Sequence, residues 1–289
     1  MSGKVWIITG ATSGTGLALA QKLVEKGDKV VGTSRNINKW KDLDISKHEN
    51  FLGIQVDITS EKSIQEGINQ ALGKFGTIDV LVNNAGQGLV GSIEEITDKE
   101  HRDLFDALYF GPLNLIRAVL PIFRAKKSGY IFNVSSVAGV KSYPRFGAYN
   151  GAKFALLGMS GSLADDVKPF GIKTTCIVLG YFKTGSQTAY ENAKELIPQY
   201  DTINFWKALT DHIKTLLVPG DVNRFADIVI ETEQSENPPT ELYLGPDAFA
   251  TAESRIQEIQ KFVDEQKIKN SDVSLKDWDK NVSLFKEFN

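Results

Sequence analysis

Thr9-Gly10-Ala11-Thr12-Ser13-Gly14-Thr15-Gly16-Leu17 is the stretch of sequence that constrains the fold most. It follows an apolar run at residues 5–8 and leads into an amphipathic pattern from Leu17 to Lys26. Glycines permit a tight turn and a close approach of the backbone to a pyrophosphate, and a helix that starts there offers unpaired N–H groups and the positive end of its dipole. Three glycines also occur in ordinary loops, but the position between a strand and a helix favours a dinucleotide-binding turn.

Apolar runs of strand length alternate with longer amphipathic stretches along most of the chain. The expected strands are residues 5–8, 29–33, 51–56, 80–82, 130–134, 173–178 and 241–244. The expected helices are residues 17–26, 60–75, 97–126 with a break near Gly111-Pro112, and 149–167, and Thr97 and Glu100 have capping-box spacing. Unbroken β-branched strands separated by crossover helices predict an α/β protein, a single-domain doubly wound parallel sheet of Rossmann-like type with helices on both faces.

Two segments fall outside this alternation. Residues 185–218 form an insertion that carries Tyr190, Tyr200, Phe205 and Trp206. These aromatic residues either close over the site as a lid or simply pack the insertion onto the body. We therefore expect a dinucleotide-binding catalytic domain over residues 1–247, followed by an amphipathic helix and a polar tail over residues 248–289.

Composition and charge exclude several classes of protein. The 289 residues are 42% apolar and 24% charged, with a formal net charge of -3, so no basic surface for nucleic acid or anionic lipid is expected. No stretch approaches the ~20 apolar residues that span a bilayer, and the run at residues 5–8 is too short for a signal-peptide core. The single cysteine, Cys176, excludes an internal disulfide and fits a reducing compartment. His48, His101 and His212 lack metal-ligand spacing, so a cytoplasmic protein without a metal or a membrane insertion is expected.

The end of the second strand indicates which dinucleotide binds. Proteins that bind NAD usually place an acid there, on the ribose 2′-hydroxyl. Here the residues are Gly32-Thr33-Ser34-Arg35-Asn36, and the Arg35 guanidinium could pair with a 2′-phosphate. Alternatively, Arg35 only starts the next helix in solvent. The interpretation favours NADP(H) over NAD(H).

The spacing Gly-x3-Gly-x-Gly resembles that of the short-chain dehydrogenase/reductase family, and other motifs agree with this resemblance in order over roughly residues 4–245. Asp57-Ile58 is similar to the adenine-contacting site, Asn83-Asn84-Ala85-Gly86 to the NNAG signature, and residues 180–184 to the end of the PGxxxT motif. Tyr149-Asn150-Gly151-Ala152-Lys153 resembles the YxxxK element, with Ser136 thirteen residues upstream. The resemblance implies a cofactor site made of Gly10, Thr12, Ser13, Gly14, Thr15, Gly16, Ser34, Arg35, Asp57, Ile58, Asn84, Ala85, Gly86, Tyr149, Lys153, Gly180, Phe182 and Thr184.

The predicted reacting centre is Tyr149, Lys153 and Ser136. Positions i and i+4 share a helix face, so the Lys153 ammonium can lie near the Tyr149 phenol. An unperturbed tyrosine has a pKa of about 10, and a fixed positive charge lowers it, so that Tyr149 can donate a proton to a carbonyl oxygen or remove one from an alcohol. Ser136, rather than its neighbour Ser135, has the spacing to hold the substrate oxygen. These residues predict reduction of a ketone or aldehyde, or the reverse reaction, on a small-molecule substrate.

Two positions depart from the family pattern. Leu108 stands where many members carry an asparagine that holds a water linking the lysine to solvent, and Leu179 stands where proline is usual. Leucine cannot hold a water, so the sequence leaves open a second hypothesis, a catalytically weak nucleotide-binding redox sensor. The resemblance also implies a homodimer or homotetramer.

Overall fold

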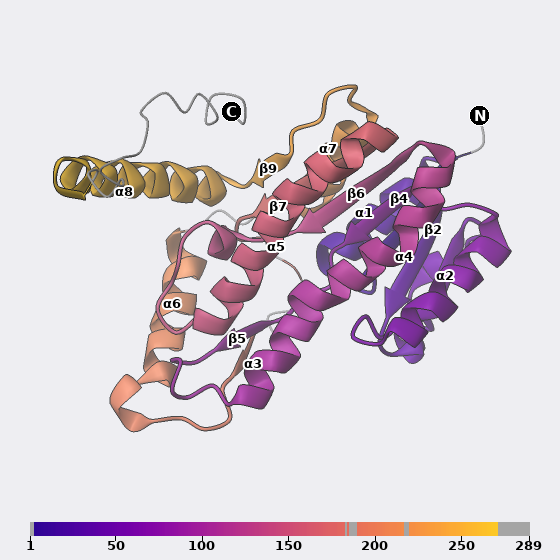
Figure 1. Ribbon diagram of the computed structural model, residues 1–289. Helices are drawn as coiled ribbons and strands as arrows, with labels where there is room; N and C mark the ends of the chain where they lie inside the picture. Colours follow the sequence, from indigo (N-terminus) through magenta and orange to yellow (C-terminus); the bar gives the residue numbers. More distant parts are fainter. Residues whose placement is uncertain (1–2, 183, 185–189, 217–219, 271–289) are drawn as a thin grey trace, which may run out of the picture.

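A seven-stranded parallel sheet forms the centre of the computed structural model, which describes residues 3–182, 184, 190–216 and 220–270 (Figure 1). The strand order is β3-β2-β1-β4-β6-β7-β9, and every neighbouring pair is parallel. The strands are β1 (Val5–Thr9), β2 (Lys29–Ser34), β3 (Phe51–Gln55), β4 (Val80–Asn83), β6 (Gly129–Val134), β7 (Ile172–Leu179) and β9 (Glu241–Leu244). The doubly wound parallel sheet expected from the sequence is confirmed, with the order reversing between β1 and β4.

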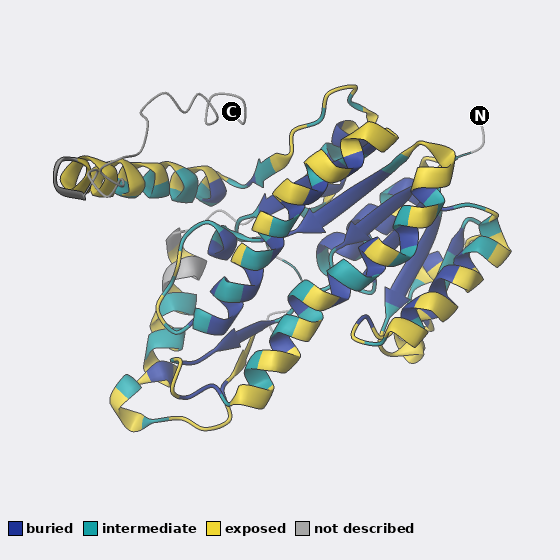
Figure 2. Ribbon diagram, viewed as in Figure 1, coloured by how far each residue is buried: buried dark blue, intermediate teal, exposed yellow. Residues whose placement is uncertain are grey.

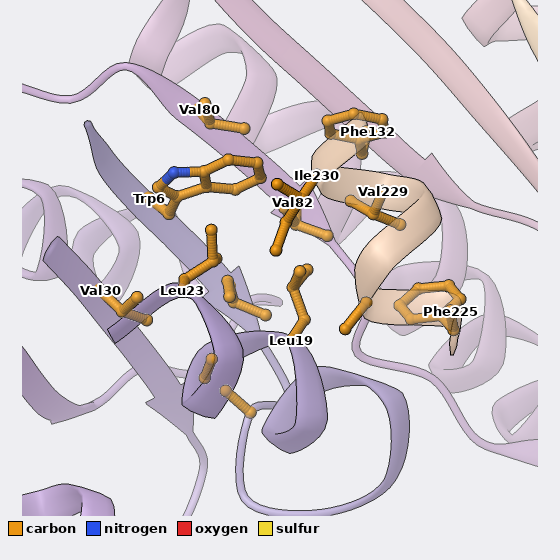
Figure 3. Packing of buried hydrophobic residues seen from close by; sticks show 14 of the residues in the cluster. Trp6, Leu19, Leu23, Val30, Val80, Val82, Phe132, Phe225, Val229 and Ile230 are labelled. Atoms are coloured by element: carbon orange, nitrogen blue, oxygen red, sulfur yellow. The ribbon is translucent and has the colours of Figure 1, made fainter. Parts of the chain in front are cut away.

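One face of the sheet is covered by α1 (Gly14–Glu25) and α7 (Val222–Gln234). Leu19 and Leu23 of α1 lie in one buried hydrophobic cluster with Phe225 of α7 and with Trp6 and Phe132 of the strands, drawn in Figure 3. The Trp6 and Phe132 rings are stacked with centroids 6.4 Å apart. Each fully buried leucine or phenylalanine contributes about 1.5–3 kcal/mol by leaving water, so this layer holds the glycine turn of α1 firmly on the sheet.

The opposite face carries α2 (Glu61–Phe75), α4 (Gly111–Lys126) and α5 (Gly147–Val167), with α3 (Asp98–Phe105) leading into α4. The capping box at Thr97 and Glu100 is present. The break expected near Gly111-Pro112 is instead a π-helical turn over Asp106–Phe110 that joins α3 to α4. Pro112 lies in the first turn of α4.

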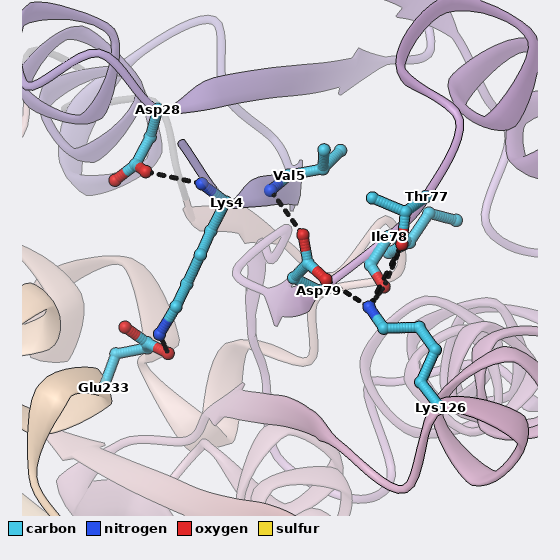
Figure 4. Close-up of polar contacts among 8 residues, drawn as sticks. All are labelled: Lys4, Val5, Asp28, Thr77, Ile78, Asp79, Lys126 and Glu233. Atoms are coloured by element: carbon cyan, nitrogen blue, oxygen red, sulfur yellow. Dashed lines mark hydrogen bonds and ion pairs between the residues drawn. The ribbon is translucent and has the colours of Figure 1, made fainter. Parts of the chain in front are cut away.

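The amino ends of the strands are held by a polar cluster, drawn in Figure 4. The Lys4 backbone N–H donates to Asp28 Oδ1 (2.8 Å), and the Lys4 ammonium pairs with Glu233 of α7. The Val5 N–H donates to Asp79 Oδ2 (2.9 Å), and Asp79 also pairs with Lys126 of α4. A cavity of about 590 Å³ opens at this edge. Parallel sheets bind ligands at the carboxyl ends of their strands, so this edge stabilises the fold and the site is sought at the other one.

The described part of the insertion contains a strand that the sequence pattern did not predict. Strand β8 (Tyr190–Asn192) pairs in parallel with β5 (Gly88–Val90), and α6 (Thr202–Leu216) follows. Residues 185–189 and 217–218 of the insertion lie outside the described residues. Helix α8 (Pro246–Asn270) extends away from the sheet with most of its length exposed (Figure 2), and the tail at residues 271–289 lies outside the described residues.

Candidate active site

The glycine turn between β1 and α1 adopts a conformation that only glycine takes without strain. Gly10 has a φ of 67° and Gly14 a φ of 56°, both in the left-handed region. A Cβ on Gly16 would lie 2.5 Å from Asn84 Nδ2 and 2.7 Å from the Gly10 carbonyl oxygen. The turn is therefore pressed against the loop that follows β4, and no side chain fits between them.

Hydrogen bonds lock this turn to the Asn84-Ala85 loop. Asn84 Nδ2 donates to the Thr9 carbonyl oxygen (2.9 Å), and Thr15 Oγ1 donates to Asn84 Oδ1 (2.8 Å). The backbone N–H groups of Asn84 and Ala85 both donate to Thr9 Oγ1 (2.9 Å each). Ser13, exposed at the start of α1, makes no side-chain cap, and Thr12 beside it is partly exposed. A rigid turn at a helix N-terminus, with glycines at positions 10, 14 and 16, fits the pyrophosphate of a dinucleotide.

The predicted adenine end lies at the carboxyl ends of β2 and β3. Arg35 is exposed and its Nη2 donates to Gln87 Oε1 (3.3 Å), while Ser34 Oγ accepts from the Asn36 N–H (3.2 Å). Asp57 Oδ1 accepts from the Thr59 N–H (2.9 Å). The Ile58 side chain is buried in the core below α4, so only its backbone faces this edge.

The loop after β7 closes the other side of the turn. The Thr184 methyl carbon lies 2.9 Å from the position of a Cβ on Gly14, so Thr184 sits over the glycine turn. The Gly180 N–H donates to the Leu244 carbonyl oxygen (2.9 Å), which ties the loop to β9. The Phe182 ring packs on Phe225 with centroids 6.0 Å apart and therefore faces the core.

Ser136, Tyr149 and Lys153 come together at the carboxyl end of β6. Ser136 begins the short turn after the strand, and its Oγ accepts from the Ala138 N–H (3.2 Å). The Tyr149 hydroxyl, near the start of α5, lies close enough to the Ser136 side chain for Ser136 to lower the pKa of the phenol. Lys153 Nζ donates to the Val134 carbonyl oxygen (2.8 Å) and lies 5.8 Å from the centroid of the Tyr149 ring. Ser135 instead donates to the Lys153 carbonyl oxygen (3.1 Å), so its hydroxyl proton is already used within the protein.

The electrostatics of this group differ from the sequence-based expectation. Burial raises the pKa of Tyr149 well above its usual value; the neighbouring Tyr190 adds to this effect and the Ser136 side chain opposes it. Burial also lowers the pKa of Lys153 to about 8. Because the Lys153 ammonium is directed at the Val134 carbonyl rather than at the phenol oxygen, the side chains of the protein do not by themselves make Tyr149 acidic.

Leu108 and Lys153 both lie close to Gly86. Leu108 is 1% exposed, and a Cβ built on Gly86 would lie 3.4 Å from Leu108 Cδ2 and 3.8 Å from Lys153 Nζ. The apolar side chain at position 108 offers no hydrogen-bonding group to this part of the site, where the resemblance placed an asparagine.

The insertion brings to the site two of the aromatic residues that the sequence offered as a lid or as packing, Tyr190 and Trp206, while Phe146 and Glu95 were not singled out. The rings of Phe146 and Tyr190 contact the Tyr149 ring, and Trp206 packs on both of them. The buried Glu95 anchors the insertion to the loop after β5, accepting from the Ile197 N–H (3.0 Å), Thr202 Oγ1 (2.6 Å) and the Ser92 N–H (2.7 Å). Nothing in the local sequence separates Glu95 from the exposed Glu94 beside it.

Neither a metal centre nor a membrane span emerges from the described residues. Within them, no three His, Cys, Asp or Glu side chains are grouped so that they could hold a metal ion. Among the helices of that same part of the chain, none is long and apolar enough to cross a membrane.

The proteins that this chain resembles in sequence are dehydrogenases, reductases and other oxidoreductases. Residues 4–195 match the family described as short chain dehydrogenase. An oxidoreductase of Botryotinia fuckeliana is 34% identical over 256 residues, covering 86% of this chain and 91% of the relative. A 3-ketodihydrosphingosine reductase of Bacteroides thetaiotaomicron is 39% identical over 203 residues, covering 69% of this chain and 71% of the relative.

Solved structures share the fold. A short-chain dehydrogenase from Streptomyces avermitilis superposes with a TM-score of 0.87 at 34% identity, covering 95% of this chain and all of the other. More distant structures of this fold were solved in complex with NAD (24% identity, TM-score 0.78) and with NADP bound (26% identity, TM-score 0.73).

Proposed function

This chain belongs to the short-chain dehydrogenase family, and from that premise we propose that it is an NADP(H)-dependent oxidoreductase that reduces a ketone or aldehyde to an alcohol, or catalyses the reverse reaction. An oxidoreductase that uses a nicotinamide dinucleotide follows from the family; the reaction and the preferred cofactor are the proposal. The observation that carries it is the convergence of Ser136, Tyr149 and Lys153 beside the glycine turn.

The Ser136 and Tyr149 hydroxyls form the pair that binds the reacting oxygen. Ser136 donates a hydrogen bond to the carbonyl oxygen and holds it beside Tyr149, whose phenol gives its proton to that oxygen as it becomes an alcohol. The bound nicotinamide supplies the hydride to the carbonyl carbon. Ser136 is held at the end of β6 and Tyr149 at the start of α5, so both donors are positioned before the substrate arrives.

Lys153 keeps this arrangement rigid and supplies the positive charge. Its hydrogen bond to the Val134 carbonyl oxygen ties α5 to β6, and its Nζ lies 5.8 Å from the centroid of the Tyr149 ring. In the proposed site Lys153 also contacts the nicotinamide ribose. Gly10, Gly14 and Gly16 receive the pyrophosphate, with Asn84, Ala85, Gly86, Gly180 and Thr184 around it.

The preference for NADP(H) rests on Arg35. Its guanidinium is exposed at the carboxyl end of β2, and residues 32–36 contain no acid to accept a hydrogen bond from a ribose 2′-hydroxyl. A guanidinium can bind a 2′-phosphate with two parallel hydrogen bonds. The Arg35 contact to Gln87 is long for a hydrogen bond and easily exchanged for such a ligand.

The substrate is an apolar carbonyl compound. Phe146, Tyr190 and Trp206 present aromatic surface beside the Tyr149 hydroxyl. The relative named for its reduction of 3-ketodihydrosphingosine supports a ketone as the reacting group. The protein is further proposed to act in the cytoplasm as a homodimer or homotetramer.

The test follows nicotinamide absorbance with NADPH or NADH and a panel of aldehydes and ketones. Turnover is expected with NADPH, and Tyr149→Phe should lower kcat by about 10²–10⁴-fold because the proton donor is lost. Tyr243→Phe, on the edge strand β9, is the matched control and should behave as the parent protein.

A redox sensor is the second candidate, and one observation favours it. Leu108 offers no hydrogen-bonding group to this part of the site, which should slow the return of a proton to Tyr149. Tight NADPH binding with no turnover over a broad panel would establish the sensor and refute the enzyme.

A further inference from the structure

Tyr190 is seated on the backbone at Gly88. The two residues are the first pair in the parallel register of β5 and β8. A Cβ on Gly88 would lie 2.0 Å from Tyr190 Cδ1 and 2.2 Å from Cε1. The ring therefore lies directly against the chain where residue 88 has no side chain, and glycine at that position is what admits the ring.

The Tyr190 ring lies next to the proposed proton donor. Its centroid is 5.8 Å from that of Tyr149, with 65° between the planes. Phe146 (5.9 Å) and Trp206 (5.1 Å) pack on its other sides. Tyr149 is only 9% exposed beneath this cluster, whereas 38% of Tyr190 is exposed at the outer surface. Tyr190 thus separates the proposed proton donor from solvent.

The segment that carries Tyr190 is anchored at several points, so its ring is held in place. The Ala193 N–H donates to the Val90 carbonyl oxygen (2.8 Å), and the Lys194 N–H to Glu100 Oε1 (3.1 Å). Farther along, Glu95 receives the Ile197 N–H, and Arg145 Nε donates to the Tyr200 carbonyl oxygen (3.1 Å). These contacts limit how far the ring can retreat when another molecule approaches Tyr149.

We propose that Tyr190 is the specificity-determining residue of this site, and that its ring excludes carbonyl compounds that carry a bulky group on the side facing the insertion. The proposal rests on the proposed function above. A carbonyl oxygen must come within hydrogen-bond distance of the Tyr149 hydroxyl, and the Tyr190 ring already borders that point. Compounds with a slim substituent pass beside the ring, whereas branched substituents overlap it.

The test compares kcat/KM for acetophenone and for isobutyrophenone, which differs only in a branched group beside the carbonyl. Tyr190→Ala should raise the isobutyrophenone-to-acetophenone ratio about 10-fold or more, because a few carbon atoms in a tight pocket change discrimination by about 10–200-fold. Tyr190→Phe keeps the ring and should keep the ratio within about twofold. Tyr200→Phe is the control on the same segment, since its hydroxyl meets the exposed Glu94 instead of the site. A parental ratio in Tyr190→Ala overturns the proposal.

Gly88→Ala offers an independent route to the same result. The added methyl should displace the Tyr190 ring, raise the substrate ratio and lower Tm. In the Tyr190→Ala background the same change meets no ring, so Tm should fall less and the ratio should not rise further. Equal Tm losses in both backgrounds would show that the ring is not seated on Gly88 and overturn the argument. If the parent protein oxidises NADPH with neither ketone and with no compound of the wider panel, the proposed function fails. The Tm comparison still tests whether the Tyr190 ring packs on the backbone at Gly88.

Discussion

Glu95 should decide whether the insertion stays closed on the body, and Glu95→Gln tests this. The carboxylate is 1% exposed and accepts three hydrogen bonds, with Oε1 receiving the Ile197 N–H and Oε2 receiving the Ser92 N–H and Thr202 Oγ1. Glutamine keeps the shape but replaces one acceptor oxygen with an NH₂ donor. Whichever way the amide is turned, at least one buried donor then faces another donor.

The cost follows from that count. A buried donor left without an acceptor costs about 1–3 kcal/mol, and the remaining bonds lose the assistance of the charge. A total of about 2–4 kcal/mol is expected. Since 1.4 kcal/mol is a factor of ten in an equilibrium constant, the insertion should open about 30- to 1000-fold more often than in the parent protein.

Hydrogen exchange of the backbone amides measures this opening. In Glu95→Gln the Ile197 and Ala193 amides should exchange faster, while amides of β1 and β6 keep their protection. Glu94→Gln is the matched control because it removes the same charge from the neighbouring exposed residue, whose contact is the Tyr200 hydroxyl (2.7 Å). If the two variants exchange equally over residues 190–202, the clamp assigned to Glu95 is refuted.

The hydrogen bonds that Glu95 accepts should weaken at low pH. Burial by itself would raise the pKa of Glu95, but the hydrogen bonds from Thr202, Ser92 and Ile197 together outweigh it and hold the pKa below its usual value of 4.5. A carboxyl group with a lowered pKa in the folded state stabilises that state fully above the pKa of the unfolded chain. The contribution is lost as the pH falls below about 4.5, so exchange at Ile197 should accelerate there in the parent protein and much less in Glu95→Gln.

Three further predictions concern the cofactor site and the core. Gly16→Ala should abolish NADPH binding, measured by nucleotide fluorescence, because its Cβ would lie 2.5 Å from Asn84 Nδ2; Gly73→Ala, where a Cβ meets nothing within 4 Å, should bind normally. Arg35→Ala should weaken NADPH about 10- to 100-fold relative to NADH, since charge-assisted bonds of about 1.5–3 kcal/mol are lost; equal losses for both cofactors would contradict a phosphate contact. NADPH affinity should fall as the pH rises through about 8, where buried Lys153 loses its charge, and Lys153→Arg should remove that step from a binding titration.

The sheet could be predicted from the sequence because its signal is local. Buried strands such as Val80–Asn83 and Gly129–Val134 appear as short runs of apolar residues, and the glycine turn marks where the first helix begins. The π-helical turn over Asp106–Phe110 was expected as a break, since Gly111-Pro112 resembles a helix end. The extra residue in that turn is accommodated by packing that no local pattern records.

The sequence left open whether the aromatic insertion covers the site or only packs on the body, because the covering of Tyr149 depends on contacts far apart in the chain. Strand β8 exists only through its pairing with β5, which lies about a hundred residues earlier, and its three residues carry no alternating pattern. Leu108 was noted as a departure from the sequence, but only the structure shows that it lies close to Gly86, as Lys153 does. Ser136, Tyr149 and Lys153 were thus recognisable from their spacing, whereas the residues that pack around them were not.

Lys153 donates a hydrogen bond to Val134, the last residue of β6, and Ser136 follows the same strand. Tyr190 reaches the site from a separate pair of short strands, β5 and β8. The proposed proton-transfer residues and the proposed specificity residue therefore lie on different secondary-structure elements. Residues of the insertion can be exchanged for others without loosening the bond between α5 and the sheet. A protein built this way can acquire new substrates in evolution, or in the laboratory, while Ser136, Tyr149 and Lys153 stay in place.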